Sequence, residues 1–199
     1  MPFVTYSSDY MLAQWATNHG TYASLHSAYS ASGANELAGG SYGRLAITWG
    51  SPSGESVSLA GTPYTFNVPA SSTVAWIGFW DASSSGNFSG MLPNGGATAY
   101  AFAAPSSTGV LLAPGSSYTA NQQVVVFPTG GATLPSGLTA GTVYYVKSPT
   151  ADSFSLSATS GGTAITLTAD GAGIIQAITQ EAFSGAGTFA VNSGTWNLV

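Results

Sequence analysis

The chain has 199 residues, a formal net charge of −5 and only 5% charged residues. A nucleic-acid-binding surface needs clustered basic side chains, and the two cations, Arg44 and Lys147, lie far apart in the sequence, so the composition excludes that class of partner. The chain has no cysteine, which excludes disulfides and thiolate metal sites. It also has no run of about 18 apolar residues, so the sequence predicts no membrane insertion.

The N-terminal segment predicts one helix, over about residues 8 to 18. Ser7 or Ser8 is the expected cap, and Gly20 is the expected stop. Met11 and Trp15 lie four residues apart, so we expect them on one buried face. The same segment lacks the basic start and the continuous apolar run of a secretory signal, so the sequence predicts no signal peptide.

After the helix the pattern changes to short strands. Residues 22–28, 42–49 and 55–59 alternate with a period of two, which is typical of strands with one wet and one dry face. Residues 73–80 read TVAWIGFW and are almost wholly apolar, which favours a central strand buried on both faces. Turn-forming residues separate these runs, so the chain is predicted to be all-β, an antiparallel β-sandwich with one short N-terminal helix.

A second β unit is expected towards the C-terminus. Residues 103–117 are rich in Pro, Gly and Ser and indicate a boundary. The sequence therefore predicts a sandwich domain over 1–117, completed by 179–199, and a small β module over 118–178 that is either inserted or appended. Strands of this module are expected at 122–127, 142–147, 153–157, 163–168 and 173–180.

The residues that could carry ionic catalysis are few and scattered. His19 and His26 match no metal-ligand spacing, and the seven carboxylates lie mostly in turns, where they usually hydrogen-bond to the local backbone. There is no G-x-S-x-G motif for a serine hydrolase. We expect no catalytic, metal-binding or cofactor-binding residue and no cofactor.

Aromatic residues make up 12% of the chain and are its one feature with binding potential. Trp49, Trp76 and Trp80 could stack on the sugar rings of a host cell-surface glycan if their faces were open. Both alternating sets of residues 73–80 are apolar, however, which favours a core or subunit contact.

Two segments carry a family resemblance. Residues 23–50 read ASLHSAYSASGANELAGGSYGRLAITWG, and residues 66–96 read FNVPASSTVAWIGFWDASSSGNFSGMLPNGG. Their marks are Leu25-His26, the turn from Gly33 to Glu36, Gly39 to Tyr42 with Arg44, and an aromatic strand that ends in Asp81-Ala82. This pattern resembles small virion proteins of tailed bacteriophages, especially those of actinobacteria, which are usually labelled tail fibre or minor tail proteins and sometimes minor capsid or decoration proteins. The later run from Val124 to Thr168 looks like a small β module of phage tail and appendage proteins.

The resemblance implies a non-enzymatic structural component of a virion, assembled in the bacterial cytoplasm. The leading interpretation is a minor tail or tail-fibre subunit that binds other virion proteins, forms a symmetric homo-oligomer and contacts the host surface. Alternatives are a head decoration protein that stabilises the capsid, a carbohydrate-binding receptor module and, last, a depolymerase. Within the shared motif we expect Glu36 to pair with Arg44 across the turn and hold the loop. The other interpretation is an ordinary exposed pair worth under about 1 kcal/mol.

Overall fold

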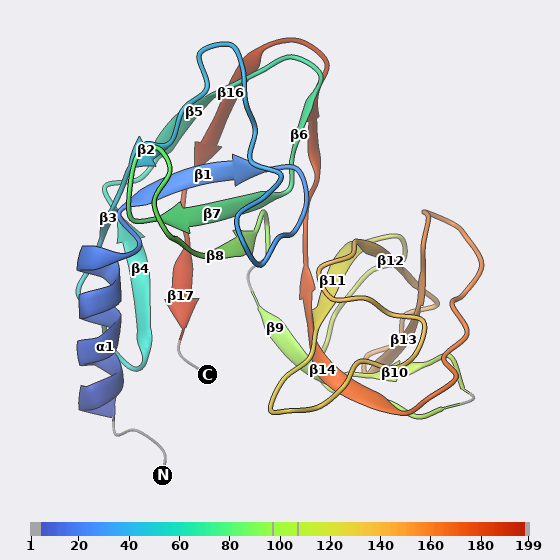
Figure 1. The fold of residues 1–199 in the computed structure, drawn as a ribbon. Coiled ribbons are helices and arrows are strands. Elements are labelled where there is room, and N and C mark those ends of the chain that lie inside the picture. Colours follow the sequence, from blue (N-terminus) through green and yellow to red (C-terminus); the bar gives the residue numbers. More distant parts are fainter. Residues whose placement is uncertain (1–4, 97, 107, 198–199) are drawn as a thin grey trace. The chain divides into compact units, whose positions relative to one another are not determined.

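The computed structural model describes residues 5–96, 98–106 and 108–197 of the chain. They divide into two compact units: the first runs to Leu92 and resumes at Gln180, and the second comprises Pro93–Thr179. The strands pair antiparallel throughout, and one helix precedes them (Figure 1). The all-β class, the N-terminal helix and a small β module are therefore confirmed. The described residues contain no helix that is long and apolar enough to cross a membrane.

The helix α1 (Thr5–Asn18) opens the first unit, and the predicted cap is wrong. Ser8 lies inside the helix and is buried, and its hydroxyl donates to the Glu55 carboxylate at 3.2 Å. The Asp9 carboxylate accepts the backbone N–H of Glu55 at 2.9 Å. These two side chains therefore bind the turn before β4 (Ser56–Ala60) instead of capping the helix.

The buried face of α1 agrees with the predicted one only in part, because Trp15 packs against the core of the first unit as expected but Met11 does not. Leu12 is buried, whereas Met11 is 38% exposed. The predicted stop is confirmed, because the helix ends at Asn18 and the backbone N–H groups of His19 and Gly20 both donate to the Trp15 carbonyl.

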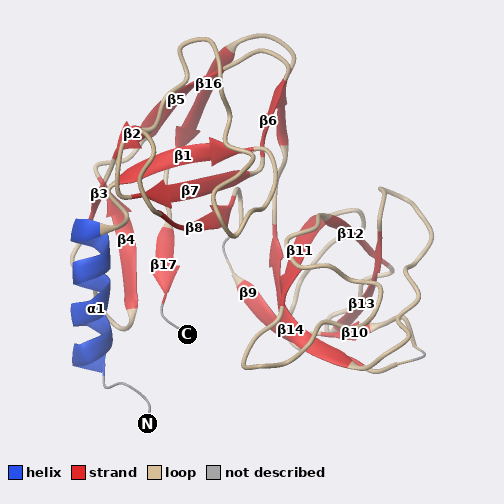
Figure 2. Cartoon of the chain, in the orientation of Figure 1, coloured by secondary structure: helices blue, strands red, loops and turns tan. Residues whose placement is uncertain are grey.

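A four-stranded sheet, in the order β2-β1-β7-β8, forms one layer of the first unit. Three smaller sheets, β15-β6, β16-β5 and β17-β4-β3, complete this unit (Figure 2). The strands of the four-stranded sheet are β1 (Tyr22–His26), β2 (Leu45–Ala46), β7 (Trp76–Trp80) and β8 (Phe88–Pro93). The remaining strands are β3 (Thr48–Trp49), β5 (Tyr64–Val68), β6 (Ser72–Val74), β15 (Glu181–Phe183), β16 (Gly187–Val191) and β17 (Thr195–Asn197).

Two of the predicted strands are divided in the structure. Residues 73–80 fall into β6 and β7, because the chain changes sheets at Ala75, whose N–H donates to the His26 carbonyl at 2.9 Å. β6 then pairs with β15, and β7 pairs with β1. Residues 42–49 likewise contain two short strands, β2 and β3, which belong to different sheets.

The register of β1 on β7 sorts their side chains into two faces. Leu25 lies opposite Ile77, and both belong to the hydrophobic core of the unit. Ser24 lies opposite Gly78 on the other face of the pair. The core combines residues of β1 and β7 with those of β5 and β16, namely Ala23, Leu25, Phe66, Val68, Ile77, Phe79, Phe189 and Val191.

The second unit is a closed antiparallel barrel in the order β10-β13-β12-β11-β14-β9. Its interior is filled by apolar side chains such as Phe102, Val126, Phe154 and Ile175. The expected strand at 163–168 is wrong, because that segment makes only an isolated bridge between Ser157 and Ala164. The barrel strands are β9 (Ala99–Ala104), β10 (Leu111–Leu112), β11 (Gln123–Phe127), β12 (Tyr144–Lys147), β13 (Ser153–Ser157) and β14 (Gly171–Ala177).

Candidate functional site

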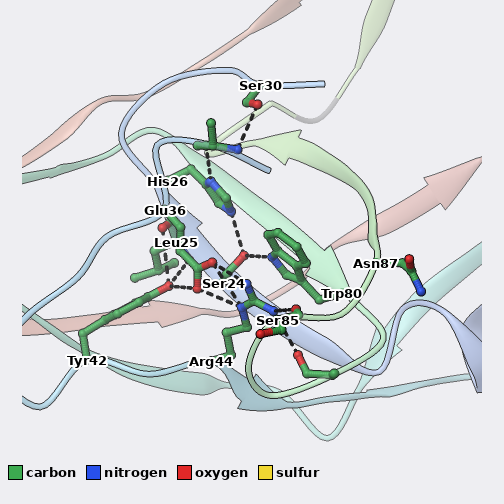
Figure 3. Close-up of polar contacts among 12 residues, drawn as sticks. Ser24, Leu25, His26, Ser30, Glu36, Tyr42, Arg44, Trp80, Ser85 and Asn87 are labelled. Carbon is green, nitrogen blue, oxygen red and sulfur yellow. Dashed lines mark hydrogen bonds and ion pairs between the residues drawn. The ribbon is translucent and has the colours of Figure 1, made fainter. Parts of the chain in front are cut away.

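The face of β1 and β7 that points away from the core carries a buried polar cluster. Its members come from β1, from β7 and from the segment 27–44 that joins β1 to β2 (Figure 3). We call it the Arg44 cluster, and it consists of Ser24, His26, Glu36, Tyr42, Arg44 and Trp80.

Arg44 lies at the centre of this cluster, and all three of its guanidinium nitrogens donate. Nε and Nη2 both bind the Glu36 carboxylate, the latter at 2.7 Å. Nη1 donates to the carbonyls of Ala82 and Ser85, at 3.1 and 2.7 Å. The guanidinium carbon lies 3.5 Å from the centre of the Trp80 ring, which is a close cation–π contact. The Arg44 side chain is only 9% exposed.

Arg44 thereby connects two loops that are distant in sequence. Glu36 belongs to the segment 27–44, and the two carbonyls belong to the turn 81–87 after β7. Asp81 and Asn87 close that turn, because the Asp81 carboxylate accepts both the backbone and the side-chain N–H of Asn87 at 2.7 Å. The hydrogen bonds from Asn87 lower the pKa of Asp81.

A chain of hydrogen bonds crosses the interior of the cluster. A carbonyl only accepts, so His26 Nδ1–H donates to the Ala34 carbonyl at 2.9 Å and leaves Nε2 as an acceptor. The Ser24 hydroxyl then donates to Nε2 at 2.7 Å while its oxygen accepts Trp80 Nε1–H at 2.9 Å. The bonds fix the neutral tautomer of His26, and burial lowers its pKa.

Tyr42 fastens the segment 27–44 to the first strand. Its phenolic oxygen accepts the backbone N–H of Leu25 at 2.8 Å, and its O–H lies within reach of the Glu36 carboxylate at 3.3 Å. Burial raises the pKa of Tyr42, so the phenol stays protonated. Backbone bonds from Ser27 to Asn35 and from Leu37 to Leu25 add a short ladder to the same edge.

Two glycines make room for the cluster. A Cβ at Gly78 would lie 2.4 Å from His26 Nε2, so only glycine leaves space for the bond between Ser24 and His26. A Cβ at Gly33 would lie 2.4 Å from the Trp80 ring, and the φ of Gly33 is +79°, in the left-handed region that favours glycine. The segment 27–44 therefore lies directly against the tryptophan.

The chemistry open to this cluster is structural. Ser24 and His26 form a hydrogen-bonded pair of the kind that activates serine nucleophiles, yet both residues have no exposed surface. A substrate cannot reach them in this fold. Within the described residues, no three His, Asp or Glu side chains lie close enough together to hold a metal ion.

The structure brings Glu36 and Arg44 into direct contact and places Trp80 on the guanidinium. The other two tryptophans of interest lie elsewhere. Trp76 is 1% exposed. Trp49 is half-buried, donates to the Gly20 carbonyl at 2.6 Å and packs its ring against Trp15 and Phe79. The rings of Trp76 and Trp80 are therefore buried and offer no open face for stacking on a sugar, whereas Trp49 lies at the groove between α1 and residues 47–52.

Sequence reasoning did not anticipate the roles of Ser24, His26 and Tyr42. Two signals were present in the sequence. Ser24 and His26 are two residues apart and so lie on the same face of a strand, and a glycine interrupts the otherwise bulky run 76–80. Only the register that sets Ser24 opposite Gly78 combines these signals into one cluster.

A family model matches the N-terminal part of the chain. Residues 9–93 match the family model described as podophage GP4 fiber I protein gp80. The matched region runs from α1 to β8 and includes the whole Arg44 cluster. No curated protein and no solved structure matches the chain. The family model covers residues 9–93. It therefore supports a structural protein of the phage tail-fibre type, and this support comes from the first unit only.

Proposed function

We propose that the chain is a non-enzymatic structural subunit of a bacteriophage virion, of the minor tail or tail-fibre type. The observation that carries the proposal is the family match over residues 9–93. The subunit acts by binding other virion proteins. The match names a podophage, and the expected link to actinobacterial phages stays a prediction.

The contacts of the two cations support assembly through shape and backbone contacts. Both cations are bonded within the chain: Arg44 to Glu36 and two carbonyls, and Lys147 Nζ to the Gly162 carbonyl at 2.9 Å. Their charge is therefore committed to internal contacts, and the net charge is −5. A partner is then recognised mainly through uncharged surface, and the interaction should depend little on salt.

The Arg44 cluster supports a mechanical role in the same way. It locks the segment 27–44 and the turn 81–87 onto the sheet with bonds that leave few alternative arrangements. A subunit of a particle benefits from such rigidity, because a pre-ordered surface loses less conformational entropy on assembly. The burial of Trp76 and Trp80 favours this assembly role over sugar binding.

Localisation on the particle tests the proposal. Purified particles of the encoding phage are labelled with a gold-conjugated antibody raised against the full chain and imaged by electron microscopy. We expect label at the tail. Label spread over the capsid shell would instead identify a head decoration protein, and absence of the chain from purified particles in mass spectrometry would overturn a structural role altogether.

A further inference from the structure

Large exposed hydrophobic side chains concentrate on α1. Among the described residues four are exposed, and three of them are Tyr6, Tyr10 and Met11, at 81%, 59% and 38%. A cluster of exposed apolar groups on one element marks an interaction surface more often than a scattered set does. Tyrosine is also one of the residues most enriched in protein interfaces.

The exposed tyrosines belong to a regular seam. Tyr6, Tyr10, Ala13 and Thr17 follow each other at spacings of four, three and four, the heptad pattern by which one helix packs along another. At about 100° per residue this seam lies opposite the buried Ser8 and Leu12. α1 contacts β3 and β4 of its own unit (Figure 2), and the small residues of the seam, Ala13 and Thr17, lie beside the contact with β3.

A groove runs beside the small end of the seam. It has a volume of about 330 Å³ and is lined on one side by Ala13, Ala16 and Thr17 and on the other by residues 47–52. One half of the seam therefore carries the large side chains of Tyr6 and Tyr10. The other half carries the small side chains of Ala13 and Thr17 and lies beside the groove. An antiparallel second copy of α1 would place Tyr10 opposite Ala13 and Tyr6 opposite Thr17, so that large side chains meet small ones.

The charges of α1 do not oppose a second copy as the occupant, and the pattern of large and small side chains favours one. The only charged side chain of α1 is Asp9, and its carboxylate accepts the Glu55 N–H. The seam itself is uncharged. Two chains that each carry a net charge of −5 can therefore meet along α1 without bringing like charges face to face.

We propose that two copies of the chain dock through α1, antiparallel and about a twofold axis, with the tyrosines of each copy packed beside Ala13 and Thr17 of the other. A twofold contact uses the same patch on both copies, which fits a single self-complementary seam. This inference stands on the geometry of the first unit and does not depend on the virion proposal.

Sedimentation of the full-length chain over a range of concentrations tests the contact. Wild type is expected to show a reversible dimer. Tyr10→Glu puts a charge into the seam and should raise the dissociation constant at least about tenfold. Met11→Glu is the matched control, with the same new side chain at the adjacent exposed position but off the seam, and it should change the constant less than about threefold.

Folding of each variant is checked by its thermal unfolding midpoint at a concentration where wild type is monomeric, and both exposed substitutions should change this midpoint little. A wild type that remains monomeric at about 100 μM would overturn the proposal, since a specific interface of this kind should bind at micromolar concentrations. Equal weakening by Tyr10→Glu and Met11→Glu would also overturn it, because the two side chains point in directions about 100° apart.

The orientation has its own test, because the chain has no cysteine. In the antiparallel contact the two copies of residue 17 are about 16 Å apart along the helix axis, which is too far for a disulfide. Thr17→Cys should therefore give no disulfide-linked dimer under mild oxidation, while Thr17→Cys remains dimeric in sedimentation. Rapid cross-linking of Thr17→Cys would overturn the antiparallel arrangement.

Discussion

Arg44 shows how a chain with few charges can place one of its two cations inside the fold. In the fold, the Glu36 carboxylate, two carbonyls and the Trp80 ring take the place of the water that would hydrate the guanidinium. A planar group with five donors suits such a site, and a lysine ammonium could not reproduce its geometry. The energy of the arrangement depends on all partners being present, because a buried charge without its partner is costly.

Replacing this arginine should therefore destabilise the first unit strongly. Arg44→Ala leaves the 20% exposed Glu36 carboxylate without its cation and is expected to cost about 2–4 kcal/mol of unfolding free energy. Lys147→Ala is the control, because it removes the other cation and one hydrogen bond and should cost about 1 kcal/mol or less. Urea unfolding followed by circular dichroism compares them, and equal losses would contradict a special role for Arg44.

His26 should make the stability depend on pH. Burial lowers its pKa in the folded state below the ordinary value of 6.5, so the unfolded chain binds a proton more readily than the folded chain. Linkage then requires the contribution of His26 to be fully present above pH 6.5 and to be lost progressively as the pH falls below it. Wild type should lose unfolding free energy in that range.

The measurement is a series of urea unfolding curves between about pH 5 and pH 8. His26→Gln should have a lower stability at neutral pH and a flatter profile below pH 6.5. His19→Gln changes an exposed histidine and should retain the wild-type slope. A pH dependence of stability that disappears in His19→Gln and persists in His26→Gln would contradict the prediction, because it would originate at His19.

At the scale of elements, the segment 27–44 owes its position to its contact with β7. Gly33 lies against the Trp80 ring, with no room for a Cβ. Gly40 belongs to the same segment and has a φ of +58°, but nothing lies within 4 Å of a Cβ built there. The two glycines therefore separate the cost of a left-handed backbone from the cost of a lost contact.

Gly33→Ala and Gly40→Ala should both lose about 1 kcal/mol from backbone strain alone. Gly33→Ala should lose a further 1–3 kcal/mol, approximately, because the new methyl group must displace the Trp80 ring from the guanidinium. Chemical unfolding gives the difference, and the tryptophan emission of folded Gly33→Ala should shift while that of Gly40→Ala stays unchanged. Identical unfolding curves for the two variants would show that the segment does not rest on Trp80.

The sequence predicted those elements whose signals are local. Residues 153–157 alternate between turn signals, and β13 covers the same residues. Residues 163–168 show the same local pattern, yet they make only one bridge, because a strand also needs a neighbour with free backbone groups. Residues 73–80 are divided for a related reason: the chain changes its pairing partner at Ala75, and a continuous apolar run contains no mark of that change.

The candidate site could be predicted only in part. Two opposite charges in one glycine-rich stretch suggested a contact between Glu36 and Arg44. The contacts of Arg44 with Trp80 and with the turn 81–87 join residues about forty positions apart, and they follow from the register of β1 on β7. Pairing register depends on how the whole sheet packs, so local sequence patterns do not determine it.

At the scale of the whole molecule, the chain leaves the first unit once and returns to it. The ends of the second unit are bonded to each other: the Thr179 N–H donates to the Asn94 carbonyl at 2.7 Å, and the Asn94 side chain donates to the Thr179 carbonyl at 3.0 Å. Pro93, which precedes Asn94, and Gln180, which follows Thr179, are therefore close to each other. A short linker can join them.

We predict that the first unit folds without the second. A variant in which a short Gly-Ser linker replaces residues 94–179 keeps every element around the first core, including β15, β16 and β17. All five tryptophans, at positions 15, 49, 76, 80 and 196, lie in the first unit, so tryptophan fluorescence reports on that unit alone. The variant should keep the wild-type emission spectrum and a cooperative unfolding transition.

Two further variants make the deletion decisive. Extending the replaced segment to residues 88–179 also removes β8 from the four-stranded sheet, and this longer deletion should abolish the cooperative transition. Adding Arg44→Ala to the shorter deletion should cost the same free energy as in the full chain, because distant sites in independent units contribute additively. If the shorter deletion itself loses the transition, the first unit depends on the barrel for its stability, and the two units form one cooperative fold.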